Sequence, residues 1–306
     1  MKRFTCVISI IMLWSCNQKA GDQPKKDTEI ETKTEDITIT DQIEKLATDF
    51  KFTEGPAVDK KGNVYFTDIP DNKIYIWTTT DSLSTYREDS NGANGLYFDK
   101  QQNLYACEGG KTRITRTSPE GDYKVIASEY NGQEFNRTND LWVNSKGGVY
   151  FTDPKYGQDQ DQLPQGSMQV YYFDADNDSV IRVTDELIKP NGLIGTPDGQ
   201  TLYITDPGAN TTYRYSIEND GTLSDKSLFV EVGGDGMTID QEGNVYLTTS
   251  GQPQVDVFSP EAKLLKSIKV PEQPSNVTFG GENRDQLFIT ARTSLYRVGL
   301  NQKGVQ

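Results

Sequence analysis

The sequence predicts an all-β fold, a six-bladed β-propeller whose blades are four-stranded antiparallel sheets. Three observations predict it: one strand motif recurs six times, each copy follows a second apolar run across a turn, and further short apolar runs complete each unit. The composition agrees, because only 34% of the 306 residues are hydrophobic while 27 are Gly and 16 are Tyr. Such a chain favours many short strands over a helical core.

The recurring motif has an aromatic residue at its centre. Its copies read "GNVYFTD", "NLYACE", "GGVYFTD", "QTLYITD", "GNVYLTT" and "DQLFIT", and their aromatic residues are Tyr65, Tyr105, Tyr150, Tyr203, Tyr246 and Phe288. The spacing of about 40 to 53 residues is typical of propellers and solenoids. A parallel solenoid is less favoured, because the hairpin turns imply antiparallel neighbours.

Four strands are expected in each unit. The two strands of each hairpin are followed by runs such as "KIYIW", "QVYYFD" and "TYRYSI". The sixth unit ends near Leu300, with room for only three strands. We therefore expect Ile43–Phe50 to supply its outer strand and to close the ring.

The N-terminal residues read as an export signal and a tether. Lys2 and Arg3 precede the apolar run "FTCVISIIMLW", which is too short to span a bilayer, and "LWSC" resembles a lipoprotein signal. We expect a signal peptide at 1–15, lipidation of Cys16, a flexible acidic tether at 16–42 and a propeller at 43–306. The expected location is a bacterial cell envelope, periplasmic or outer-membrane, with the membrane contacted only through the lipid. The alternative is a plain secretory signal with an incidental cysteine.

Charge and residue usage exclude several functions. The formal net charge is −14 and no basic patch is present, so nucleic acid is not an expected partner. His is absent, which removes Ser-His-Asp and Cys-His mechanisms and the usual zinc ligands. Once the signal is removed, Cys107 is the only cysteine besides Cys16, and it lies in an apolar strand as a small buried side chain. The acidic tether favours a solvated monomer.

A column of side-chain oxygens lies eleven or twelve residues before each repeated aromatic. Its members are Glu54, Asn94, Asn139, Asn191, Asp235 and Asn276. The first strand of each propeller blade lines the central channel, so these oxygens are expected to meet around the axis. Carboxylate and amide oxygens form the donor set of a hard cation, and Ca²⁺ fits best. Alternatively the Asn and Asp residues cap turns, although this does not account for Glu54.

These motifs resemble one known family. "TEGP", "NRTND", "KPNG" and "GDGM", in their repeat setting, are similar to the senescence-marker protein, regucalcin and gluconolactonase family, especially its bacterial gluconolactonases, over about Ile43 to Val298. The resemblance implies a six-bladed propeller with a divalent cation, usually Ca²⁺, in its channel. It also implies a sugar lactone as the substrate, metal ligands at Glu54, Asn139, Asn191 and Asp235, and a substrate contact at Arg137. Asp235 is further implied as the general base. One departure is Gly109, where bacterial members often have His.

The remaining site predictions each allow two interpretations. Asn94 and Asn276 are expected to hold substrate or water, or else to cap turns. Tyr156 either faces substrate or packs its loop, and Pro154–Met168 is either a lid or a solvated loop. Arg137 alternatively forms a structural salt bridge.

The predicted function is a cation-dependent lactonase acting on a sugar lactone such as gluconolactone, with Ca²⁺, or else Mg²⁺, Mn²⁺ or Zn²⁺, polarising the carbonyl. The alternatives are an esterase or organophosphate hydrolase with the same metal site, and a non-catalytic propeller that Ca²⁺ stabilises.

Overall fold

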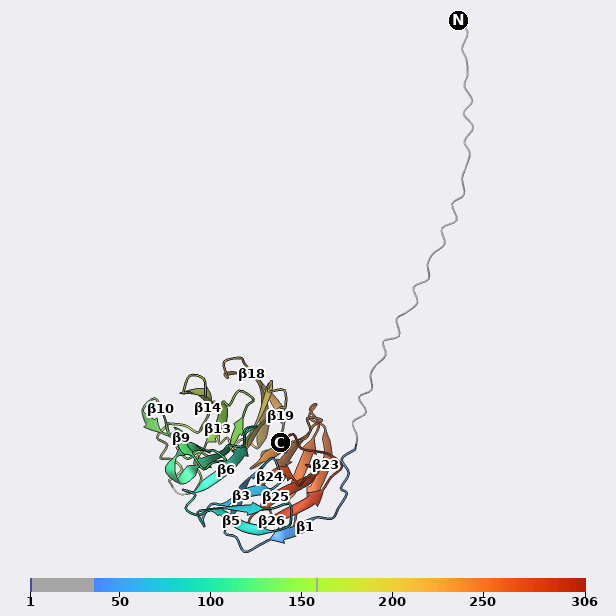
Figure 1. The fold of residues 1–306 in the computed structure, drawn as a ribbon. Coiled ribbons are helices and arrows are strands. Elements are labelled where there is room, and N and C mark those ends of the chain that lie inside the picture. Colours follow the sequence, from blue (N-terminus) through green and yellow to red (C-terminus); the bar gives the residue numbers. More distant parts are fainter. Residues whose placement is uncertain (2–35, 158) are drawn as a thin grey trace. The chain divides into compact units, whose positions relative to one another are not determined.

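The structure is a computed structural model that describes Met1, residues 36–157 and residues 159–306 (Figure 1). The predicted signal peptide after Met1, the lipidation site Cys16 and the tether up to residue 35 lie outside the described residues. Within the described ranges, no helix has the length and apolar character needed to cross a membrane.

Six four-stranded antiparallel sheets stand around a common centre, which confirms the predicted six-bladed propeller (Figure 1). The first blade consists of β2 (Thr53–Val58), β3 (Val64–Asp68), β4 (Lys73–Trp77) and β5 (Leu83–Arg87). The second consists of β6 (Ala93–Phe98), β7 (Leu104–Glu108), β8 (Arg113–Thr117) and β9 (Tyr123–Ala127). The third consists of β12 (Leu141–Val143), β13 (Val149–Asp153), β14 (Gln169–Asp174) and β15 (Ser179–Thr184). The fourth consists of β16 (Leu193–Gly195), β17 (Thr201–Asp206), β18 (Thr211–Ile217) and β19 (Leu223–Val230). The fifth consists of β20 (Met237–Ile239), β21 (Val245–Thr248), β22 (Gln254–Phe258) and β23 (Leu264–Lys269). The sixth consists of β24 (Pro274–Gly280), β25 (Gln286–Ala291), β26 (Ser294–Gly299) and β1 (Glu44–Ala47). A short hairpin of β10 (Glu129–Tyr130) and β11 (Gln133–Glu134) and a 3₁₀ turn, η1 (Gly109–Lys111), complete the described elements.

The N-terminal strand closes the ring as expected. β1 pairs antiparallel with β26, and Glu44 stands opposite Arg297. A salt bridge of 2.8 Å joins Arg297 Nη2 to Glu44 Oε2. The sixth blade therefore takes its outer strand from the beginning of the described chain and its other three from the end.

The compact unit begins at Asp36 rather than at Ile43. Ile37 is buried in an apolar cluster of the last two blades. The Thr40 N–H donates to the Gly299 carbonyl at 2.9 Å. The residues before Ile43 therefore pack on the propeller instead of belonging to the tether, which the polar composition did not reveal.

The polar end of the repeated motif has a structural role. The Asp68 carboxylate, at the end of β3, accepts the backbone N–H groups of Lys51 and Phe52 at 2.9 and 3.0 Å. The two other blades whose motif ends in Asp repeat this arrangement, in the contacts of Asp153 with Asn136 and Arg137 and of Asp206 with Ile188 and Lys189. Each carboxylate thus fixes the chain entering the first strand of its blade, the strand that carries the predicted oxygen column.

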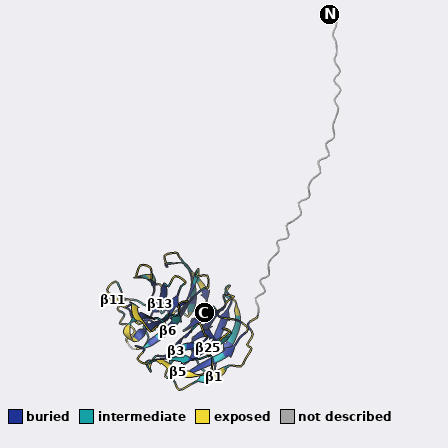
Figure 2. Ribbon diagram, in the orientation of Figure 1, coloured by how far each residue is buried: buried dark blue, intermediate teal, exposed yellow. Residues whose placement is uncertain are grey.

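The core lies between neighbouring blades, where the inner strands bury both faces. Figure 2 shows these strands dark blue and the outer strands paler or yellow. Tyr150, Tyr246 and Phe66 are fully buried there, so the central strands read as continuous apolar runs. Cys107 is also fully buried, and burial raises the pKa of its thiol well above the ordinary value. This environment fits the predicted packing role and disfavours a thiolate.

Candidate functional site

Seven of the eight predicted site residues line one cavity of about 240 Å³ around the propeller axis. The eighth, Asn276, lies outside it. The walls come from the starts of the first strands and from the connections before them, which is where the oxygen column places its members. The seven residues are Glu54, Asn94, Arg137, Asn139, Tyr156, Asn191 and Asp235.

A hydrogen-bonded group forms the floor of this cavity. The Asn191 amide nitrogen donates to Tyr156 OH at 2.8 Å and to Asp235 Oδ1 at 2.5 Å. The amide oxygen of Asn191 has no hydrogen-bond partner among the described residues, so Tyr156 and Asp235 orient this side chain with its oxygen available to a ligand. Tyr156 therefore has a defined role in the floor, beyond packing its own loop.

The two carboxylates of the floor interact directly. Burial, and then the charge of Asp235, raise the pKa of Glu54 well above its ordinary value. Burial raises the pKa of Asp235 to about 6, and the Glu54 side chain is within hydrogen-bonding reach of it. Neither carboxylate forms an ion pair with any residue that the structure describes. Two buried acids that face each other destabilise the fold unless cations balance them. Arg292 supplies part of this balance, because its charge lowers the pKa of Asp235 without forming an ion pair.

The donor set fits a hard divalent cation. Glu54 and Asp235 supply two carboxylates, and Asn191 and Asn139 supply amide oxygens, which are the ligands Ca²⁺ prefers. No cluster of three or more His, Cys, Asp or Glu side chains occurs in the described part of the chain. The site would therefore hold a cation with two carboxylates and neutral oxygens, leaving coordination positions for other ligands.

Asn276 lies below the floor, deeper in the channel. Its amide nitrogen donates to Asp140 Oδ2 at 3.3 Å, and its amide oxygen accepts the Val277 N–H at 2.8 Å. A hydrogen bond from Asn276 also lowers the pKa of Glu54, against the larger effect of burial. The substrate contact predicted for Asn276 stays a prediction, and in this structure the side chain contacts Asp140 and Glu54. Asp140 was not singled out in the sequence, although burial raises its pKa to about 7.

Arg137 extends into the cavity past two glycines. A Cβ atom on Gly109 would lie 2.9 Å from the Thr138 carbonyl oxygen and 3.3 Å from Arg137 Cγ, and one on Gly157 would lie 3.9 Å from Arg137 Nη1. The guanidinium makes no ion pair or hydrogen bond within the described residues, so the salt-bridge alternative has no partner there. Gly109 therefore leaves the space through which the Arg137 side chain passes.

The sequence reasoning missed a second cavity, of about 250 Å³, beside the first. Both cavities share Phe52, Tyr156, Asn191 and Asp235 as walls, and the second adds Arg292. Arg292 stands in the two-residue turn between β25 and β26, with its guanidinium 5.6 Å from the centre of the Phe52 ring. The only sequence signal was its position just after the sixth motif copy, where other blades also place loops of the site.

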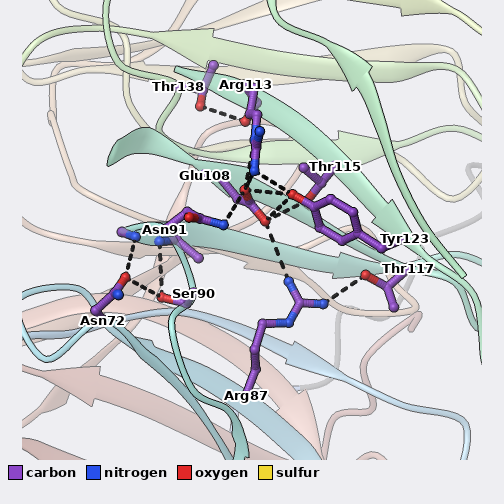
Figure 3. A network of polar contacts seen from close by, with 12 residues as sticks. Asn72, Arg87, Ser90, Asn91, Glu108, Arg113, Thr115, Thr117, Tyr123 and Thr138 are labelled. Atoms are coloured by element: carbon purple, nitrogen blue, oxygen red, sulfur yellow. Dashed lines mark hydrogen bonds and ion pairs between the residues drawn. The ribbon is translucent and has the colours of Figure 1, made fainter. Parts of the chain in front are cut away.

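A second buried glutamate, Glu108, lies in blade two and has very different surroundings from Glu54 (Figure 3). Its Oε2 lies 2.8 Å from Arg113 Nη2, and its Oε1 lies 3.6 Å from Arg87 Nη1. Asn91 Nδ2 donates to it at 3.0 Å, and Tyr123 OH at 2.9 Å. This network fixes the end of β7 immediately before Gly109.

The fold and the cavity together define a class of protein: a six-bladed β-propeller with an oxygen-lined cavity at its central channel. Residues 52–293 match the family model described as the SMP-30/Gluconolactonase/LRE-like region, and the chain belongs to that family.

Three similar proteins extend this assignment. A gluconolactonase from Zymomonas mobilis is 28% identical over 295 residues, covering 86% of this chain and 82% of the relative. The solved structure of a gluconolactonase from Xanthomonas campestris has a TM-score of 0.78 at 28% identity and covers 87% of this chain and 94% of its own. A regucalcin from Agrobacterium tumefaciens has a TM-score of 0.73 at 17% identity, covering 87% of this chain and 95% of its own, and shares the fold.

Proposed function

We propose that this protein is a divalent-cation-dependent lactonase that opens a sugar lactone, with Ca²⁺ as the preferred cation. The observation that carries the proposal is the pair of buried carboxylates, Glu54 and Asp235, in a cavity that also contains amide oxygens and an unpaired Arg137. Membership of the family and the similarity to the Zymomonas and Xanthomonas gluconolactonases support the choice of a lactone.

Glu54, Asn139, Asn191 and Asp235 would hold the cation. When bound, the cation would offset the charge of the two carboxylates and polarise the lactone carbonyl. The chain's own residues account for the rest of the chemistry. Arg137 donates hydrogen bonds to ring hydroxyls or to the carboxylate that forms, and Asn94 contributes a further polar contact at the cavity wall. Tyr156 holds Asn191 in the orientation described above.

Asp235 is the proposed general base. Water attacks the carbonyl carbon, Asp235 accepts the proton that water loses, and the bond between the carbonyl carbon and the ring oxygen breaks. The same proton then passes to the ring oxygen, which leaves as a hydroxyl. The pKa of about 6 in the metal-free cavity lies close to neutral pH, and a bound cation lowers it by favouring the carboxylate.

The direct test is hydrolysis of D-glucono-1,5-lactone by the purified protein. Initial rates are measured with Ca²⁺, after chelation, and after Ca²⁺, Mg²⁺, Mn²⁺ or Zn²⁺ is restored. We expect a rate above the spontaneous background that chelation abolishes and Ca²⁺ restores. A protein that binds Ca²⁺ but never exceeds the background would exclude this activity for the substrate tested.

We also propose that Cys16 carries a lipid that anchors the protein in a bacterial cell envelope. The support is the sequence pattern alone, because Cys16 lies outside the described residues. Replacing Cys16 with Ser should move the protein from the membrane fraction to the soluble fraction. An unchanged distribution would contradict the anchor.

A further inference from the structure

We propose that Arg292 forms a subsite for an anionic group, so that the preferred lactone carries a carboxylate or phosphate away from its ring ester. The inference rests on the proposed lactonase function, and it extends that function to a substrate class. Its basis is the second cavity, which meets the predicted site at Asp235 and Asn191 and continues on the other side of Phe52 and Tyr156.

The two cavities give the site two compartments. Their volumes are about 240 and 250 Å³, and each is smaller than the roughly 300–1,000 Å³ that is common for small-molecule pockets. Asp235 and Asn191 belong to both, so a ligand held at the floor can extend into either side. Arg137 lies only in the first compartment and Arg292 only in the second. A sugar ring in the first compartment would therefore leave the second for a substituent.

Arg292 has the properties of an anion ligand. Its guanidinium has no ion pair or hydrogen bond with any residue in the described ranges, although the chain carries a formal charge of −14 and four of the eight other described arginines form ion pairs. The side chain lies over the Phe52 ring, which holds a planar guanidinium in place without using its N–H donors. Those donors match a carboxylate or phosphate in a two-point contact.

The backbone of Arg292 gives a second, independent indication. Its φ is 47°, in the left-handed region that long side chains seldom adopt, within a two-residue hairpin turn where Asn or Gly is favoured. The Arg292 carbonyl accepts the Thr53 N–H at 2.8 Å, and the side chain contacts the Phe52 ring and lowers the pKa of Asp235 through its charge. The turn geometry therefore does not account for a long cationic side chain at this position, whereas an anion subsite does.

The test compares two pairs of ligands that differ in one charged group. D-glucono-1,4-lactone and D-glucaro-1,4-lactone are the substrates, and D-gluconate and D-glucarate, their ring-opened acids, are the ligands for calorimetry. Both acids carry the carboxylate that ring opening produces, so only the additional carboxylate of D-glucarate reports on a substituent. Phosphate as the substituent is tested in the same way with 6-phospho-D-gluconate.

Arg292→Asn suits the turn and removes the guanidinium, so it should fold. Arg116→Gln is the matched control, because Arg116 is exposed on β8, lines neither cavity and also removes one positive charge. In the wild-type protein we expect tighter binding of D-glucarate or 6-phospho-D-gluconate than of D-gluconate. Arg292→Asn should reduce this preference about 10-fold, the effect of one charge-assisted contact, and Arg116→Gln should retain it.

The kcat/KM ratio of the two lactones should follow the same pattern. No preference in the wild type, an unchanged preference in Arg292→Asn, or an equal loss in Arg116→Gln would overturn the subsite. If neither lactone is hydrolysed, lactonase activity is excluded for these two substrates, and the binding preference of the acids still decides the subsite.

Discussion

Glu108 and Glu54 are both buried glutamates near the same cavity, yet their surroundings differ completely. Glu108 is paired with Arg113 and Arg87 and accepts further hydrogen bonds (Figure 3). Glu54 faces another acid, Asp235, and its backbone partner is the adjacent Gly55 N–H. The comparison separates two uses of a buried carboxylate. Where protein cations pair with the carboxylate, the group fixes the structure, and where two carboxylates face each other without an ion pair, the site suits the cation proposed above.

The largest expected effect concerns the unbalanced pair. Replacing Asp235 with Asn should lower kcat for the lactone by about 100-fold or more, because an amide cannot accept the proton from water. The measurement is kcat at saturating Ca²⁺, with bound Ca²⁺ determined in parallel. Asp225→Asn, at an exposed position on β19, is the control. Wild-type turnover in Asp235→Asn would exclude Asp235 as the base.

The second prediction compares the effects on stability of replacing each of the two glutamates. Glu108→Gln should lower the free energy of unfolding by about 2–4 kcal/mol, because two arginines lose their counter-charge. Glu54→Gln should raise it in the metal-free protein at about pH 8, because a buried repulsion is removed. Urea unfolding in the presence of chelator measures both. Equal losses of stability in the two variants would contradict the distinction between them.

The third prediction concerns pH. In the folded, metal-free protein the pKa of Asp235 is raised from 3.8 to about 6, so the folded state keeps a proton that the unfolded state releases. Stability should therefore fall as pH rises from about 4 to about 6, and it should be fully recovered below the unfolded pKa.

Thermal unfolding in chelator across this window gives the slope. The double variant Glu54→Gln, Asp235→Asn should show a smaller slope, and so should the wild-type protein with Ca²⁺. An identical slope in the double variant would show that other groups cause the dependence, with Asp153 the first to examine, because burial also raises its pKa to about 7.

The smallest effects are expected from two tyrosines. Tyr156→Phe removes the acceptor that orients the Asn191 amide, and we expect roughly 10-fold weaker Ca²⁺ binding with little change in stability. Tyr123→Phe removes a donor to Glu108, so the free energy of unfolding should fall by about 1 kcal/mol with Ca²⁺ binding unchanged. Calorimetric titration and urea unfolding of both variants measure the two effects. Unchanged Ca²⁺ binding in Tyr156→Phe, together with weaker Ca²⁺ binding in Tyr123→Phe, would contradict the assignment of Tyr156 to the ligand site and of Tyr123 to the structural network.

The sequence predicted those features that the repeat carries. The recurring motif identified the blades, and the oxygen column identified Glu54, Asn191 and Asp235, because equivalent strand positions in a closed ring must meet at its axis. Ring closure was predictable because the sixth unit was one strand short. Asn276 shows what the column cannot predict. It occupies the equivalent strand position, but its contacts with Asp140 and Glu54 determine the direction of its side chain.

The repeat could not reveal contacts made by loops. Arg292 lies over Phe52, and the two are far apart in the chain, with no motif connecting them. Ile37 precedes the first unit, so no pattern indicated that it packs on the last blades. The contrast between Glu54 and Glu108 was likewise hidden, because Glu108 pairs with Arg113 on the next strand and with Arg87 on the outer strand of the first blade, and no motif connects these positions.

The pairing of β1 with β26 also has a consequence for biosynthesis. Glu44 and Arg297, which form a salt bridge across this pair, are separated by 253 positions in the chain. During synthesis the early strands can form hairpins as they emerge, but β1 has no partner until β26 has been made. The sixth blade, and with it the turn that carries Arg292, is therefore completed only after the five other blades have been synthesised. Until then the edge of β2 that faces β24 in the finished ring stays open to solvent and to association with other chains.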